Sequence, residues 1–238
     1  MPKVLGIIGA RSGSKGILDK NIRLLAGKPM FAWIAEAAQK SRYAPRIIMS
    51  TDSAEYAKLA NHFGVETPFM RPAELSGDSV PDFDYLYHAV KWMEEHEDFV
   101  PDIIVRLPPT SPLCTPEHID ACIDLLVQDS GADSSRTITK APKHPYKLWK
   151  KEGEYLVPFL SEEYIGLKDA HNLPRQSFPE AYQHVDVIAL RHATLMDNKS
   201  MAGEHIRFFE IKKEEAIDID DELGFMVAEQ LLKQRSGL

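Results

Sequence analysis

Apolar runs typical of buried β-strands alternate with helical patterns through the first half of this 238-residue chain. Such alternation is typical of βαβ units, so it predicts a mainly parallel sheet covered by helices. The expected strands are Val4–Ile8, Arg46–Ser50 and Asp102–Leu107, and the expected helices between them are Met30–Gln39, Ala54–His62 and Asp82–Glu94.

The regular pattern weakens after one more helix, which is expected at Pro116–Gln128 with Thr115 as its N-cap. From about Lys140 to Ala181 the chain is rich in Pro, Lys, Tyr and Trp and has little periodicity. This composition predicts an irregular or β-ribbon excursion from the main sheet. We therefore expect a single domain, 1–238, carrying an excursion at 140–181.

The main fold is expected to resume with strands at Tyr182–Leu190 and Ile206–Ile211 and to end with a helix at Asp221–Lys233. Helical spacing predicts that one apolar face of this last helix points inward. The residues expected on that face are Leu223, Met226, Val227 and Leu231.

Charge and cysteine content exclude several classes of protein. The formal net charge is −8, which argues against a surface that coats nucleic acid, because phosphate backbones require an excess of Lys and Arg. Cys114 and Cys122 have no paired Cys/His arrangement nearby, so neither a disulfide framework nor a zinc site is expected. No stretch has the length of a membrane span or a signal peptide, so we expect a soluble cytoplasmic protein.

The turn after the first apolar run combines glycines with cations. Residues 9–16 read GARSGSKG, and Lys20-Asn21 follow closely. Backbone N–H groups of a glycine-rich turn can converge on an anion, and Arg11, Lys15 and Lys20 add positive charge. The string matches neither the P-loop nor the dinucleotide fingerprint. It predicts a third kind of polyphosphate site, and the alternative is a basic surface turn.

Other polar residues are expected near this turn, because the carboxyl ends of parallel strands share one edge of a sheet. Asp52 or Ser53 is expected to cap the helix that follows, with no catalytic part for Asp52. Arg71 and Asp78 are candidates for contacts with ribose or base, the alternative being a surface ion pair.

Asp218 and Asp220 lie two positions apart in an apolar setting, so in an extended segment both point to one face. Two adjacent carboxylates repel each other unless a cation lies between them, and Mg²⁺ is usually held by one or two carboxylates together with phosphates. The pair therefore predicts a magnesium site. The alternative is a polar edge strand or an N-cap for the last helix.

Taken together and in this order, the motifs of the chain resemble those of the acylneuraminate (sialic acid) cytidylyltransferases, over nearly its whole length. The segments that carry the resemblance are Ala10–Gly16 with Lys20-Asn21, Ala26–Pro29, Ser50–Ser53, Arg71-Pro72 with Asp78, Pro109–Leu113, Arg175-Gln176 and Ile217–Asp220.

The resemblance implies a Rossmann-like, three-layer nucleotide-diphospho-sugar transferase fold. It also implies that the chain uses CTP and Mg²⁺ to convert a sialic-acid-like sugar into a CMP-sugar, and that it forms a homodimer in which the 140–181 excursion helps to close over the sugar. The implied nucleotide-binding residues are Ala10, Arg11, Gly13, Ser14, Lys15, Lys20, Asn21, Arg71 and Asp78. The implied catalytic residues are Arg11, Lys15 and Asp220, the metal ligands Asp218 and Asp220, and the sugar-binding residues Lys147, Arg175 and Gln176.

The chain departs from the family pattern mainly on the sugar side. Pro108 and Cys114 replace a common Gln and Arg, Asp186 replaces a small residue, Ala189 replaces a Tyr, and Gly224 replaces an acidic residue. These departures leave two alternatives open. One is a guanylyl- or other nucleotidyltransferase that acts on a sugar 1-phosphate, and the other is a catalytically inactive nucleotide-binding protein.

Overall fold

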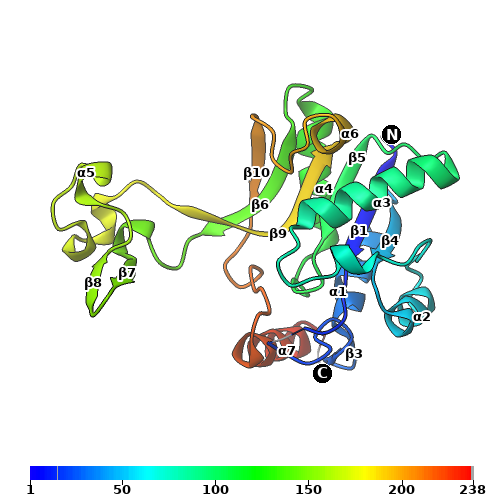
Figure 1. The fold of residues 1–238 in the computed structure, drawn as a ribbon, viewed down its shortest axis with the longest axis horizontal. Helices are drawn as coiled ribbons and strands as arrows, with labels where there is room; N and C mark the ends of the chain where they lie inside the picture. The colour runs from blue at the N-terminus through cyan, green and yellow to red at the C-terminus, as the bar shows by residue number, and fades with distance from the viewer. Residues whose placement is uncertain (15, 237–238) are drawn as a thin grey trace.

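A twisted six-stranded sheet forms the centre of the computed structural model, which describes residues 1–14 and 16–236 (Figure 1). Its strand order is β10-β6-β9-β5-β1-β4. The strands of this sheet are β1 (Val4–Gly9), β4 (Arg46–Ser50), β5 (Ile103–Leu107), β6 (Ser134–Lys140), β9 (Tyr182–Arg191) and β10 (Ile206–Glu210).

Most neighbouring strands run parallel, as the sequence predicts. β1 pairs in parallel with β4 and β5, and β6 with β10, whereas β9 is antiparallel to both β5 and β6. The pairing of β9 with β6 shifts register between Arg136 and Thr137, and Asp186 at this point has a φ of 54°. This β-bulge redirects the Asp186 side chain, and bulges commonly have that effect beside functional sites.

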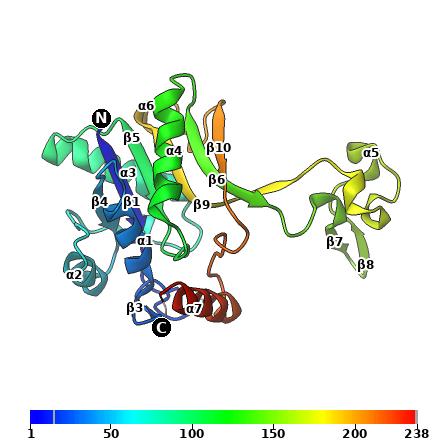
Figure 2. The ribbon, with the colours of Figure 1, turned by 180° about the vertical axis from the view of Figure 1, so that it is seen from behind.

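Helices cover both faces of the sheet, which gives three layers (Figures 1 and 2). Buried residues of α1, α2 and α4 pack on one face, and those of α3 and α6 pack on the other. The α-helices of the body are α1 (Met30–Gln39), α2 (Ala54–His62), α3 (Asp82–Glu97), α4 (Pro116–Gln128), α6 (His192–Met196) and α7 (Glu222–Ser236), and a 3₁₀ turn lies at Ala73–Leu75.

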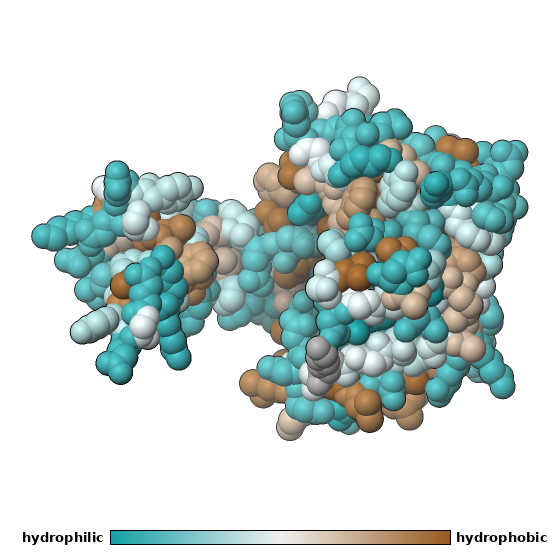
Figure 3. All heavy atoms as spheres, viewed as in Figure 1, coloured by the Kyte–Doolittle hydropathy of each residue, from teal (hydrophilic) through white to brown (hydrophobic). Residues whose placement is uncertain are grey.

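Residues 141–181, here called the arm, project from the body between β6 and β9 and form a separate lobe on a narrow neck (Figure 3). The arm matches the expected excursion of β-ribbon and irregular chain. It contains β7 (Trp149–Glu152), β8 (Tyr155–Pro158), α5 (Glu162–Ile165) and 3₁₀ turns at Pro145–Lys147, Ala170–Asn172 and Arg175–Ser177. A second small ribbon, β2 (Leu24–Leu25) with β3 (Lys28–Pro29), lies beside α7.

The predicted inward face of the last helix is wrong for three of its four residues, whereas the fourth, Leu231, is partly buried and packs against the core as expected. Leu223 and Met226 are 69% and 67% exposed, and Val227 is 41% exposed. The helix instead buries Phe225, Ala228 and Leu232 against residues of the N-terminal segment, including Ile17, Leu25 and Met30. This packing fixes the end of the chain next to the loop after β1.

None of the helices formed by the described residues is long and apolar enough to span a lipid bilayer.

Candidate active site

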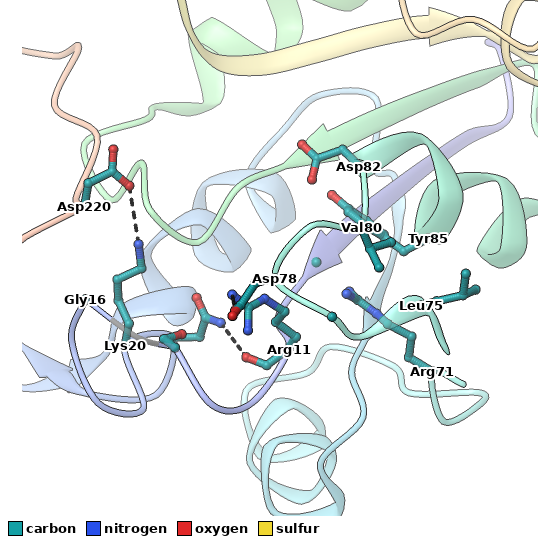
Figure 4. A pocket seen from close by; sticks show the side chains of 14 residues that line it. Arg11, Gly16, Lys20, Arg71, Leu75, Asp78, Val80, Asp82, Tyr85 and Asp220 are labelled. Atoms are coloured by element: carbon teal, nitrogen blue, oxygen red, sulfur yellow. Dashed lines mark hydrogen bonds and ion pairs between the residues drawn. The ribbon is translucent and has the colours of Figure 1, made fainter. Parts of the chain in front are cut away.

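A cleft of about 530 Å³ opens beyond the carboxyl end of β1, at the edge where ligands bind in open α/β sheets (Figure 4). Its wall comes from three separate parts of the chain: the loop after β1, the segment from Arg71 to Tyr85, and the residues just before α7. The lining residues are Gly9, Arg11, Ser14, Gly16, Lys20, Asn21, Arg71, Leu75, Gly77, Asp78, Val80, Asp82, Tyr85 and Asp220.

Asp52 holds the loop after β1 in place. Its two carboxylate oxygens accept hydrogen bonds from the backbone N–H of Ser12 (2.7 Å) and the Ser12 hydroxyl (2.8 Å). Burial favours a higher pKa for Asp52, but these hydrogen bonds outweigh it and hold the pKa below its usual value. The helix cap next to it is Ser53, whose hydroxyl accepts from the N–H of Tyr56. These contacts give Asp52 a structural role in holding the loop.

The rest of the loop is fixed by backbone contacts. The N–H of Ala10 donates to the carbonyl of Ser50 (3.0 Å), and the side-chain amide of the buried Asn21 donates to the carbonyl of Arg11 (3.0 Å). Gly13 has a φ of +68°, a conformation that glycine adopts without steric cost. Lys15, which the sequence places among the phosphate-binding residues, lies outside the described residues.

Arg11 reaches across the mouth of the cleft. One terminal guanidinium nitrogen lies 2.5 Å from a carboxylate oxygen of Asp78, and both side chains are about one-third exposed (29% and 37%). Figure 4 shows the two side chains directed toward each other over the cleft. An incoming anion can replace this carboxylate as the partner of the guanidinium, because the planar donor fork suits phosphate as well as carboxylate.

Arg71 forms the floor of the cleft. Its guanidinium is buried, donates to the hydroxyl (2.9 Å) and carbonyl (2.6 Å) of Ser50, and lies 4.4 Å from the ring centroid of Tyr85. Burial lowers the pKa of Arg71, and the neighbouring Tyr85 and Asp52 oppose this effect. The arrangement places a fixed positive charge beneath the cleft rather than a surface ion pair.

The segment before α7 contacts the loop after β1 at Lys20. The Lys20 ammonium donates to the carbonyl of Ile219 (2.8 Å) and lies 3.5 Å from a carboxylate oxygen of Asp220. Gly16 allows this close approach, because a Cβ atom at that position would lie 2.8 Å from the carbonyl oxygen of Asp220. The Asp220 side chain is 81% exposed and faces the cleft (Figure 4).

Asp218 lies two positions before Asp220, and the residue between them, the buried Ile219, donates its N–H to the carbonyl of Thr110. Asp218 is an exposed residue, but neighbouring protein buries part of its carboxylate. This burial raises its pKa, the Thr110 hydroxyl opposes the rise, and the negative charge of Asp220 adds to it. Two mutually repelling carboxylates form an oxygen donor set, which fits Mg²⁺.

The two acidic residues that follow have other partners. Asp221 accepts a hydrogen bond from the N–H of Gly224 (2.8 Å), as an N-cap of α7 does, and Glu222 forms an ion pair with Arg23 (2.5 Å). The helix-cap role therefore belongs to Asp221 rather than to Asp218 or Asp220.

The residues predicted to bind the sugar lie in the arm, apart from this cleft. Arg175 and Gln176 line a second cavity of about 470 Å³ in the arm, where the Arg175 guanidinium donates to the carbonyl of Ala141. Lys147 is not in the wall of that cavity, and its ammonium lies 3.5 Å from the carbonyl oxygen of His171. None of these three residues lines the nucleotide cleft of the same chain, and the arm that carries them projects away from the body (Figure 1).

Several residues that the sequence analysis did not single out also shape the site. Tyr85 packs so closely against the end of β1 that a Cβ on Gly9 would lie 2.6 Å from its ring, and Asp82 pairs with Arg106 (2.5 Å). Tyr85 occurs in an ordinary apolar helix pattern, so nothing in its spacing pointed to the cleft.

Three further residues, Cys114, His118 and Asp186, converge behind the cleft, all of them buried. Cys114 and Cys122 are both free thiols, in agreement with the expected lack of a disulfide. Cys114 and His118 are four residues apart at the start of α4, a spacing that could have drawn attention to the pair. Asp186 reaches them from the bulge in β9, and no local pattern predicts such a contact.

Comparison with known proteins gives a consistent result. Residues 5–231 match the family model described as Cytidylyltransferase. The chain is 30% identical over 237 residues to a CMP-N,N'-diacetyllegionaminic acid synthase of Campylobacter jejuni, with 99% of this chain and 97% of the relative covered. It is 29% identical to the post-translational flagellin modification protein B of Campylobacter coli, over 99% of this chain and 97% of that protein.

A third relative is the N-acylneuraminate cytidylyltransferase of Escherichia coli, 29% identical over 95% of this chain, which spans about half (51%) of that protein. Among solved structures, a CMP:2-keto-3-deoxy-manno-octonic acid synthetase in complex with CTP superposes with a TM-score of 0.71 at 18% identity, covering 98% of this chain and 99% of that one. This likeness shows that the two proteins share a fold. The match of residues 5–231 to the family model establishes that the chain belongs to the cytidylyltransferase family of nucleotidyltransferases.

Proposed function

We propose that the protein transfers CMP from CTP to a sialic-acid-like nonulosonic sugar and releases pyrophosphate. The single observation that carries the proposal is the meeting of the glycine-rich cationic loop with Asp220 at one cleft, through Lys20 and Gly16. The relatives whose names specify CMP-legionaminic acid synthesis and N-acylneuraminate cytidylyl transfer support the choice of base and sugar class.

The cationic side chains of the cleft have a clear part in such a reaction. A sugar hydroxyl attacks the α-phosphorus of CTP, the bond from that phosphorus to the bridging oxygen breaks, and pyrophosphate leaves. Arg11 and Lys20, together with Lys15 of the same loop, hold the phosphates and neutralise the charge that develops on the leaving group. Arg71 and Asn21 keep the loop and its floor in position, so that catalysis depends on orientation and charge rather than on a covalent intermediate.

Asp218 and Asp220 are the proposed ligands of Mg²⁺, because these two oxygen donors line one pocket, and Asp220 also lines the nucleotide cleft. When bound, the ion would supply positive charge to the phosphates of CTP. Lys20 lies beside Asp220 and gives the pair a counter-charge in the nucleotide-free state.

We further propose that the working form is a homodimer. The arm exposes the large side chains of Tyr155 (78%), Leu156 (62%) and Tyr164 (77%), whose apolar surface is costly to leave in water. A second copy is the occupant that the family resemblance implies. In such a dimer the arm of one chain can reach the cleft of the other, which would bring Lys147, Arg175 and Gln176 to the sugar. Light scattering after gel filtration tests this proposal, and a monomer at micromolar concentration would contradict it.

The activity is tested by measuring pyrophosphate release with CTP, GTP, UTP and ATP, each combined with a nonulosonic acid or a sugar 1-phosphate. We expect turnover with CTP and a nonulosonic acid. Turnover only with GTP and a sugar 1-phosphate would replace the proposal with guanylyl transfer. Binding of CTP without pyrophosphate release from any acceptor would indicate a protein that has lost catalysis.

The metal ligands are tested by Asp220→Asn with Asp221→Asn as the matched control. Asp220→Asn removes a charge from the proposed ion site and is expected to lower turnover by about 10²–10³-fold. Asp221→Asn is expected to retain activity, because Asn caps a helix about as well as Asp. Equal effects of the two substitutions would contradict the assignment of Asp220.

A further inference from the structure

Behind the nucleotide cleft, Cys114, His118 and Asp186 bring three different metal-ligating groups together. One donor atom from each, the Cys thiol sulfur, a His ring nitrogen and an Asp carboxylate oxygen, lies within 4.8 Å of the other two. The distance between His118 Nδ1 and Asp186 Oδ2 is 3.9 Å. A tetrahedral zinc ion, with bonds of about 2.0–2.3 Å, holds its ligand atoms roughly 3.5 Å apart, so side-chain shifts of about 1 Å would complete the set.

The Asp186 carboxylate lacks normal hydrogen bonds to the described residues. Its side chain is fully buried, as are both carboxylate oxygens. Burial raises the pKa of Asp186 to about 7, and the Ser111 hydroxyl opposes this rise. A buried carboxylate without partners is costly, and proteins pair such groups or use them to bind metals. Asp186 is also held in the left-handed region at a bulge, which turns its side chain toward α4.

His118 Nδ1 lies 3.9 Å from Asp186 and accepts a long hydrogen bond (3.5 Å) from the N–H of Thr115, which an ion bound at Nδ1 would replace. Nε2 lies 3.6 Å from a carboxylate oxygen of Glu215. Histidines that bind metals usually offer their second ring nitrogen to a carboxylate, which fixes the ring and raises its basicity. Glu215 is in turn 3.6 Å from Arg235, so its position is also fixed by an ion pair.

The charges of the cluster suit a divalent ion. A thiolate and a carboxylate together carry two negative charges, which a divalent ion neutralises within a buried site. Sulfur and imidazole ligands favour zinc-like ions over Mg²⁺. A cavity of about 180 Å³ reaches Cys114 and Arg235 from the surface and offers a path of entry.

We propose that Cys114, His118 and Asp186 bind a transition-metal ion of the Zn²⁺ class, through a sulfur, nitrogen and oxygen donor set that differs from the two carboxylates of the proposed magnesium site. With three protein ligands, the remaining tetrahedral position falls to water. The ion would tie the bulge of β9 to the start of α4 and, through Glu215, to the segment that leads to Asp218. None of the three ligands lines the nucleotide cleft, although the Asp186 carboxylate is close enough to Asp218 for the two to repel each other.

The test titrates the chelator-treated full-length protein with Co²⁺ alone and records its absorption. A cysteine ligand gives a sulfur-to-cobalt charge-transfer band in the near ultraviolet, and tetrahedral coordination gives strong visible bands. We expect both in the wild-type protein, in a ratio of one Co²⁺ to one chain. A magnesium site made of Asp218 and Asp220 cannot produce the charge-transfer band, so excess Mg²⁺ should leave it unchanged.

Variants assign the band to its ligands. Cys114→Ala should abolish it, and Asp186→Asn should weaken the affinity for Co²⁺. Glu215→Gln should weaken it by about 10–100-fold through its contact with His118. Cys122→Ala is the matched control, since Cys122 is also a buried thiol on α4 but is not part of the cluster, and it should keep the band. Circular dichroism confirms that each variant is folded.

The absence of a charge-transfer band in the wild-type protein, or its persistence in folded Cys114→Ala, would overturn the proposal. Both results are independent of pyrophosphate release. An active enzyme without the band would disprove the second metal site alone, and an inactive protein with the band would disprove the proposed function alone.

Discussion

A Cβ atom placed on Gly16 would lie 2.8 Å from the backbone carbonyl oxygen of Asp220, so the loop after β1 and the segment before α7 touch through a glycine. Real Cβ atoms essentially never approach another heavy atom so closely, and the obstructing atom belongs to the backbone. The glycine at this position therefore sets how near the cationic loop can come to the pair of aspartates.

Gly16→Ala is expected to push these two segments apart and to lower kcat/KM for CTP by at least about tenfold, because small displacements of positioning groups are costly to catalysis. Steady-state pyrophosphate release measures the effect. The control is Gly131→Ala, where the nearest obstructing atom is a flexible Asp129 side chain at 3.4 Å and activity should be retained. Full activity of Gly16→Ala would mean that the contact does not govern the site.

Phe225→Ala is expected to destabilise the protein by about 3 kcal/mol or more, the usual result of removing a buried Phe. Phe225 is 5% exposed and packs in the cluster that joins α7 to the N-terminal segment. Leu223→Ala, two residues earlier on the exposed face, should change the free energy of unfolding by less than about 0.5 kcal/mol. Urea unfolding of both variants measures these changes. A larger loss of stability in Leu223→Ala than in Phe225→Ala would indicate that the face expected from the sequence is the buried one.

Acidification should destabilise the protein partly through His88. Burial lowers the pKa of His88 below its usual 6.5, the positive charge of Arg71 adds to this effect, and Glu74 opposes it. As the pH falls below 6.5, the unfolded chain takes up a proton at this position before the folded protein does, so stability is lost. The stability contribution of neutral His88 is thus present above pH 6.5 and declines as the pH falls toward the folded pKa.

His88→Gln should therefore flatten the decline of unfolding free energy between pH 6.5 and more acidic values. Thermal or urea unfolding at a series of pH values measures the difference between the variant and the wild-type protein. Parallel curves over this range would show that His88 is not a source of the acid sensitivity.

The sequence identified the elements whose apolar pattern is local. β4, α1, α2 and α4 have the predicted bounds, because each combines a clear period with defined ends such as the Thr115 cap. The cationic loop and Asp220 were recognised as motifs, and parallel-strand geometry correctly indicated that strand ends would gather at one edge.

β6 escaped notice because its sequence, SSRTITK, is largely polar. The strand nevertheless lies inside the sheet, between β10 and β9. Its buried hydroxyls donate to backbone carbonyls: Ser135 to Cys122 and Thr137 to Val185. A buried polar group that is hydrogen-bonded costs little, but its partners lie on other elements and are invisible to a local pattern.

The choice of face on α7 failed for a related reason. Leu223, Met226 and Val227 have helical spacing, and so have Phe225, Ala228 and Leu232. Only the position of the N-terminal segment decides which stripe is buried. The contact of Asp186 with His118 and Cys114 likewise depends on a bulge and on long-range pairing.

The central claim, that the first loop and the aspartates before α7 form one catalytic site, is tested most directly by a double-mutant cycle of Lys20→Ala and Asp220→Asn on the rate of pyrophosphate release. Each substitution alone should lower kcat by about 10²–10³-fold, and the double variant should lose far less than the product of the two, because the groups act together. Losses that multiply, or near wild-type rates in either folded single variant, would contradict the claim.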